Sequence, residues 1–322
     1  PETTEALFRD VRALLNLDRF ELAKEFLKQW LSTEPDPAEL AEVQEEFGTA
    51  FFLRLLNVAE LQPVGRKVAE SVMQAAGQRL RDPARLVQLV DRLTDPNRRG
   101  SAVAELVKAG AVAAIPLVEA LGDEERQAEH DVVQSALAAL GDEAVPPLIV
   151  SLRADNDRLR LDVITVLKKI GSKKAVPPLL ARAFDPEPES EETAMAARDT
   201  LQALLGAIPS RNEAIRFLAE RLDDSLSGSV PGRLDENEQV TVWTWDRTAK
   251  RPRRTTLSAA DASMRSAAQT ARRLHRIAPE SAEFEQLFLA TGLEHAKRSH
   301  GYDSPATEAS SDIHHAASRA DI

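Results

Sequence analysis

The feature that most constrains the fold is a repeated phrase in which a glycine precedes prolines and an apolar run. The chain reads GDEAVPPLIVSL from Gly141 and GSKKAVPPLLARAF from Gly171. Prolines recur at a constant interval of 31 residues, at Pro116, Pro147 and Pro178. A period of this length indicates an array of helical hairpins, because a single hairpin cannot bury its apolar face without stacked neighbours.

Each repeat predicts two helices joined by a polar turn. Proline is tolerated in the first turn of a helix, where its missing backbone donor would be unpaired anyway, so the prolines mark helix starts. In the next segment, DRLRLDVITVLKKIG, Val163, Val166 and Leu167 share one helical face. Gly171 then ends the helix as a C-cap. Double prolines would remove donors from a sheet, which excludes strands here. The residues expected in the core between hairpins are Leu148, Val163, Leu167 and Leu179.

These repeats resemble HEAT repeats, especially the short bacterial kind related to phycobilisome-lyase repeats. The likeness covers roughly residues 84–224, in five units of declining regularity. The arginine of the family pattern is present as Arg99 and Arg160 and is replaced by His130 and Met195, so an arginine ladder would be broken. We expect His130 to be a surface or ridge residue. The resemblance implies an α-solenoid, and it is weak for function because the family is defined by stacking.

Both flanks of the repeats also look helical, and each is similar to a tetratricopeptide (TPR) pair. Near the N-terminus two short helices are expected to meet at 16–18, and Asp36 followed by Pro37 is a favourable helix start. After a linker rich in Ser and Gly, VTVWTWD and PRRTTLS predict a β-hairpin, and helices resume at Ser258. The apolar stripes of the N-terminal pair comprise Leu14, Leu17, Phe20, Ala23, Leu27 and Leu31.

The expected fold class is all-α: an α-solenoid of HEAT-like hairpins with a small β-hairpin insertion near residues 240–257. We expect more than about 65% of residues to be helical, from the repeat length and the placement of the prolines. The expected regions are a TPR-like N-terminal region at 1–80, the HEAT-like array at 81–225, the linker and β-hairpin at 226–257, a TPR-like pair at 258–301 and a disordered tail at 302–322.

Composition narrows the possible functions. The 322 residues include no cysteine, which excludes disulfides, thiolate catalysis and Cys-ligated metals. The net charge of −11 opposes general binding to nucleic acid or anionic lipid. The longest uninterrupted apolar run, 109–118, is too short to span a bilayer. We found no glycine-rich phosphate loop, zinc-protease motif or nucleophile elbow, so we expect neither an enzyme nor a cofactor.

An acidic loop interrupts the fourth repeat with the sequence DPEPESEE. It has two interpretations: a solvated insertion, or a docking site for a basic partner or a divalent cation. A metal site at 312–315 (DIHH) is a further alternative, although two histidines in a tail are more often only a tail. The acidic residues chosen as candidate partner-binding residues are Asp185, Glu187, Glu189, Glu191 and Glu192.

The segment 247–276 has the opposite charge, with nine arginines and lysines against Asp261 alone. Two tryptophans precede it and alternate onto one strand face. Either they cover the end of the repeat array, with arginines stacked on them, or the segment recognises an acidic protein or a polyanion. The basic and aromatic candidate residues are Trp243, Trp245, Arg247, Lys250, Arg251, Arg253 and Arg254.

These observations favour a non-enzymatic scaffold that mediates protein–protein interaction or assembly. The alternative is a ligand-handling or enzyme-accessory protein of the phycobilisome-lyase-like type, and binding of nucleic acid or a polyanion through 247–276 comes third. The acidic and basic segments are expected to meet either within one chain or between chains, the second giving self-association. A start at Pro1 and the lack of cysteine favour export with a removed signal peptide over the cytoplasm, and the compartment stays open.

Overall fold

The computed structural model describes residues 3–301 and is mostly helical. Helices, including short 3-10 turns, make up 74% of the described residues. A two-stranded antiparallel sheet is formed by β1 (Gln239–Asp246) and β2 (Arg251–Ser258). The predicted helical content and the predicted β-hairpin near 240–257 are both confirmed. The tail at 302–322, with its possible metal site at 312–315, lies outside the described residues.

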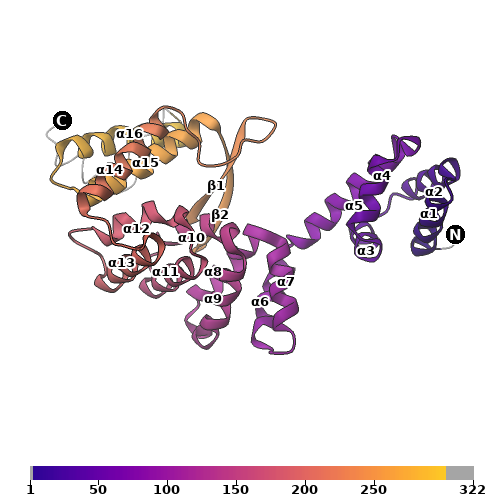
Figure 1. Cartoon of the computed structure of the whole chain (residues 1–322), viewed down its shortest axis with the longest axis horizontal. Helices are drawn as coiled ribbons and strands as arrows, with labels where there is room; N and C mark the ends of the chain where they lie inside the picture. The colour runs from indigo at the N-terminus through magenta and orange to yellow at the C-terminus, as the bar shows by residue number, and fades with distance from the viewer. Residues whose placement is uncertain (1–2, 302–322) are drawn as a thin grey trace. The chain divides into compact units, whose positions relative to one another are not determined.

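The chain divides into two compact units (Figure 1). The first comprises residues up to Arg92 together with 100–109, and the second comprises 93–99 and the residues from Gly110 onward. The helices of the first unit are α1 (Thr4–Asn16), α2 (Phe20–Leu31), α3 (Pro37–Phe47), α4 (Thr49–Asn57), α5 (Val64–Leu80), α6 (Pro83–Asp91) and α7 (Arg99–Ala109). Those of the second are α8 (Ala114–Gly122), α9 (His130–Ala139), α10 (Val145–Ser151), α11 (Asp157–Ile170), α12 (Val176–Ala183), α13 (Glu191–Leu205), α14 (Arg211–Leu226), α15 (Ala259–Ile277) and α16 (Ala282–His300).

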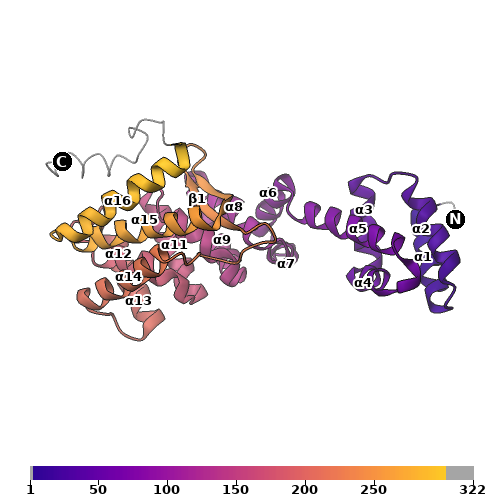
Figure 2. The ribbon, with the colours of Figure 1, turned by 90° about the horizontal axis from the view of Figure 1, so that it is seen from above.

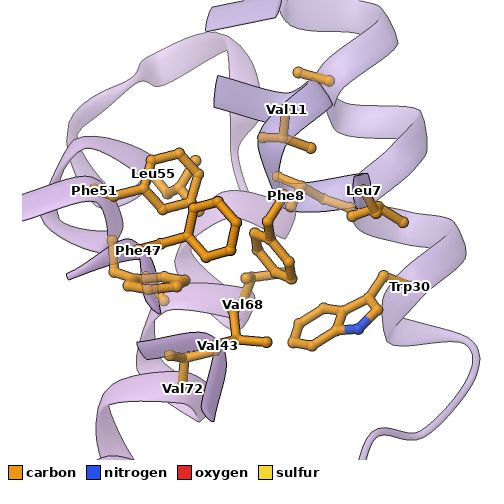
Figure 3. Close-up of a cluster of buried hydrophobic side chains, with 14 of the residues drawn as sticks. Leu7, Phe8, Val11, Trp30, Val43, Phe47, Phe51, Leu55, Val68 and Val72 are labelled. Atoms are coloured by element: carbon orange, nitrogen blue, oxygen red, sulfur yellow. The ribbon is translucent and has the colours of Figure 1, made fainter. Parts of the chain in front are cut away.

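An aromatic cluster forms the core of the first unit (Figure 3). Phe8 is fully buried and meets the indole of Trp30 edge-on, with ring centroids 4.6 Å apart, and Phe47 and Phe51 pack on its other sides. Such edge-to-face pairs add stability beyond the area that they bury. The predicted N-terminal stripe is wrong at Leu17, whose side chain is 69% exposed, because this residue follows the last turn of α1.

The repeat hairpins of the second unit follow the predicted local rules. The proline pairs occupy the first turns of α10 and α12. Gly171 ends α11 with φ of +76°, a left-handed conformation that glycine adopts without a steric penalty. Asn156 caps the start of α11 by accepting a hydrogen bond from the backbone of Leu159. The four residues predicted to lie in the core are all fully buried, which confirms the predicted helix faces: Leu148, Val163, Leu167 and Leu179.

Successive hairpins pack against each other through equivalent helices. α8 with α9, α10 with α11 and α12 with α13 form the hairpins. The first helices α8 and α10 are in contact, and α11 lies between the second helices α9 and α13 (Figure 1). The 31-residue period of the sequence therefore corresponds to a repeated packing unit of two helices.

The β-hairpin and the last helices complete the second unit. The hairpin packs against α8, α10 and α15, and it buries Val240, Val242 and Trp243. α15 lies between α14 and α16 and also contacts α12 (Figure 2). Ser258 caps α15 by accepting from the backbone N–H of Asp261. The β-hairpin and α15, which come late in the chain, thus lie beside the earlier helices α8, α10 and α12.

One described segment, Arg99–Gly122, is long and apolar enough to cross a membrane by length and composition, with a mean hydropathy of 1.6. It is longer than the uninterrupted apolar run at 109–118, which it contains. The segment is divided into α7, a 3-10 turn at Gly110–Ala113 and α8, and Gly110 has φ of +70°. Leu106 and Leu117 are fully buried within the protein, as expected of core helices.

The expectation that His130 lies on the surface is wrong. Its side chain is 5% exposed, and its Nδ1 lies 2.8 Å from Oδ2 of Asp162, which is also buried. Gln134 donates a 2.9 Å hydrogen bond to Asp162 and accepts another from Lys169. The neighbouring repeat therefore places a buried carboxylate beside the buried histidine ring.

Candidate anion-binding site

A hollow of about 370 Å³ in the second unit is lined mainly by arginines, and we refer to it as the arginine hollow. Its seven arginines are opposed by two carboxylates, those of Asp155 and Glu189. The volume falls in the range of small-ligand sites, roughly 300–1,000 Å³. The arginines of the hollow are Arg153, Arg160, Arg182, Arg247, Arg272, Arg273 and Arg276.

Three parts of the sequence bring these arginines together. Arg153 follows α10, Arg160 lies on α11, and Arg182 lies in the last turn of α12. Arg247 follows β1 directly. The other three lie on α15, which contacts α12, so the C-terminal helices and the β-hairpin close over the repeats.

Helical spacing explains why α15 presents several arginines to the hollow. Arg265, Arg272, Arg273 and Arg276 recur at intervals that place them on one face of a helix. The last three line the hollow, whereas Arg265 donates to the backbone carbonyl of Trp243 at 3.2 Å. This spacing could have identified the arginines of α15 from the sequence, but they are not among the candidate residues named in the sequence analysis.

Two carboxylates of the acidic loop bind part of this positive charge. Arg276 contacts Glu189 at 2.7 Å and Asp185 at 2.9 Å, and Glu189 is also 3.2 Å from Arg160. Burial raises the pKa of Asp185, and Arg276 opposes this rise. Burial likewise opposes ionisation of Glu189, but the hydrogen bond and charge of Arg276 outweigh it and hold the pKa of Glu189 below 4.5. Asp185 and Glu189 both pair with Arg276, so the acidic loop and the basic segment 247–276 meet within one chain.

The remaining arginines destabilise each other. Burial, together with smaller effects of nearby arginines, lowers the pKa of Arg182, Arg272 and Arg273 to about 10. Burial also lowers the pKa of Arg153, with smaller effects from Arg247 and Arg276. Water reaches the Arg153 side chain, which is exposed, but the walls of the hollow displace much of the surrounding solvent. All these groups stay protonated at neutral pH, so the hollow concentrates positive charge.

A second hollow, of about 680 Å³, adjoins the first, and Asp155 and Arg247 line both. We refer to it as the acidic hollow, because its lining carries four carboxylates against two cations. Trp245 contributes an aromatic wall. Its charged lining residues are Glu119, Asp123, Glu124, Asp155, Arg247 and Lys250.

The candidate residues from the sequence are thus only partly brought together. Arg247 and Glu189 line the arginine hollow, and Trp245 and Lys250 line the acidic hollow. The remaining candidates lie outside the lining of both hollows. On the hairpin, Trp243 is buried on β1, Arg251 forms an ion pair with Glu119 at 3.1 Å, and Arg253 and Arg254 are exposed on β2. Of the acidic candidates, Asp185 is bound to Arg276, Glu187 is exposed in the loop, and Glu191 and Glu192 are exposed in the first turn of α13.

The arrangement can bind an anion, and its lining offers little for proton transfer. Guanidinium groups stay protonated and cannot act as bases. Among the described residues, no group of three or more His, Asp and Glu side chains is placed to hold a metal ion. Comparison with known proteins adds no family: no family model, curated protein or solved structure matches this chain.

Proposed function

We propose that the chain is a non-enzymatic helical-repeat scaffold that binds a protein partner through the arginine hollow. In this proposal the hairpins form an α-solenoid of HEAT-like units with TPR-like helical pairs on both sides. The contacts between equivalent helices of successive hairpins support such stacking. The partner would present an acidic segment to the hollow.

The observation that carries this proposal is the excess of arginine in one concave place. Seven guanidinium groups face two lining carboxylates in a chain whose net charge is −11. Burying like charges together is unfavourable, and an anionic partner would relieve the repulsion. Arginine also forms bidentate hydrogen bonds with carboxylates and is enriched at interfaces.

Binding of a fluorescent oligoglutamate peptide, followed by anisotropy, tests the proposal. The informative variant combines Arg153→Gln with Arg247→Gln, because both side chains are exposed and line the hollow. The matched control combines Arg253→Gln with Arg254→Gln, which removes the same charge outside both hollows. We expect the control to bind like the wild type and the first variant to bind at least about tenfold more weakly, since each charge-assisted hydrogen bond contributes roughly 1.5–3 kcal/mol. Equal binding by all three proteins would refute the proposal.

A further inference from the structure

Three arginines of the arginine hollow are available for a ligand. Within the described part of the chain, Arg153, Arg247 and Arg273 make no ion pair with a carboxylate. They lie close enough for their charges to act on each other: Arg153 is affected by Arg247, and Arg273 is affected by Arg153. The acidic loop therefore neutralises one side of the hollow, at Arg160 and Arg276, and leaves the other side positive.

The number of acceptor oxygens favours phosphate over carboxylate at this place. A carboxylate has two oxygens and one negative charge, and Glu189 shows that this suffices for two arginines, Arg160 and Arg276. A phosphate monoester has three terminal oxygens and a charge of about −1.5 to −2 at neutral pH. It can accept from three guanidinium groups at once, and such Arg clusters are a recurring means of recognising phosphorylated segments.

The acidic hollow indicates what carries the phosphate. It shares Asp155 and Arg247 with the arginine hollow, so a ligand that extends beyond one hollow enters the other. There it meets Trp245 and an excess of carboxylates, including Asp123 and Glu124. A nucleic acid or an anionic membrane would place further phosphates against these carboxylates and be repelled. A peptide can instead place a basic side chain there.

We propose that the partner segment is a phosphorylated peptide whose phosphate binds in the arginine hollow and whose neighbouring basic residue lies over the acidic hollow. This inference rests on the proposed function, and it specifies the chemistry of the partner. Arg153, Arg247 and Arg273 hold the phosphate. Trp245 contacts the peptide between the two charged ends.

Three labelled peptides of one sequence test this inference by fluorescence anisotropy with the full chain. Each contains two lysines, and they differ at one position, which is phosphoserine, serine or glutamate. We expect the phosphoserine peptide to bind at least about tenfold more tightly than either of the others, a difference of roughly 1.4 kcal/mol, because the phosphate accepts at least one further charge-assisted hydrogen bond. The variant with Arg153→Gln and Arg247→Gln should lose this preference, and the control with Arg253→Gln and Arg254→Gln should keep it.

Other results would overturn the inference in distinguishable ways. Equal affinity for the glutamate and phosphoserine peptides would refute the phosphate site and leave the proposed function standing. If neither these peptides nor oligoglutamate bound, both proposals would fail. A phosphopeptide that binds more tightly when its lysines are replaced by glutamate would refute the role of the acidic hollow. Inorganic phosphate that binds as tightly as the phosphopeptide would refute the peptide as carrier.

Discussion

Arg276 and Glu189 are 87 residues apart in the chain and are joined by a hydrogen bond of 2.7 Å. The same arginine contacts Asp185, so one side chain of α15 fastens the acidic loop that precedes α13. The basic and acidic segments recognised in the sequence therefore meet within a single chain. This contact places the loop at the edge of the arginine hollow.

Replacing Arg276 by Gln should release the acidic loop. The arginine is 37% exposed and Glu189 is 52% exposed, so the free energy of unfolding should fall by only about 1 kcal/mol or less. Amide hydrogen exchange at residues 185–190 should become faster, while exchange in α11 stays unchanged. Arg253→Gln, on the exposed face of β2, serves as the control. Unchanged exchange in the loop would contradict this role for Arg276.

The pair of Arg276 and Glu189 should make stability depend on acidic pH. Because the pKa of Glu189 is held below 4.5 in the folded chain, its carboxylate stabilises the fold above that pH, and this contribution is lost as the pH falls through the folded value. The free energy of unfolding, measured with denaturant, should fall more between about pH 5 and about pH 3 for the wild type than for Glu189→Gln. Parallel pH profiles for the two proteins would count against the pairing.

Leu167→Ala tests the packing between hairpins. Leu167 is fully buried on α11, and truncation of such a residue should lower the free energy of unfolding by about 2–5 kcal/mol. Leu205→Ala is the matched control, because Leu205 is 42% exposed at the end of α13 and should change stability by no more than about 0.5 kcal/mol. Urea titrations monitored by circular dichroism measure both. Similar losses for the two variants would show that the hairpin interface is not where the structure places it.

Asp162→Ala tests the buried polar cluster between α9 and α11. The change leaves the buried amide of Gln134 without its acceptor and removes the carboxylate beside His130. We expect a loss of about 1–3 kcal/mol in thermal or chemical unfolding. Asp131→Ala, at an exposed position in the first turn of α9, should change stability by less than about 0.5 kcal/mol. An Asp162→Ala variant with the same free energy of unfolding as the wild type would mean that the cluster does not stabilise the fold.

Reversing Arg251, Arg253 and Arg254 to Glu tests the charge of the β-hairpin. Arg251 forms an ion pair with Glu119, and the other two are exposed. The triple reversal should change the hydrodynamic radius or oligomeric state at low salt. The change should shrink at high salt, because the Debye length falls from about 30 Å at 0.01 M to about 3 Å at 1 M. Identical light-scattering profiles at low salt would exclude a role for these arginines in holding the chain together or in self-association.

The local structure of this protein was predictable because few residues decide it. Proline in a first helical turn and glycine after a last turn act through their own backbones, so the ends of α10, α11 and α12 follow from the sequence. The buried face of α11 follows from the helical period. The β-hairpin was predicted from alternating β-branched and aromatic residues around a polar turn.

The arginine hollow and the environment of His130 were decided by tertiary structure. Arg153 and Arg182 lie in separate repeats and meet arginines of α15 only when the last helices pack on the array. His130 looks like a surface residue until Asp162, 32 positions later, supplies its carboxylate. The physical reason is the range of the interactions: backbone geometry acts within one turn of helix, whereas the burial and pairing of charge depend on neighbours that only the folded chain brings together.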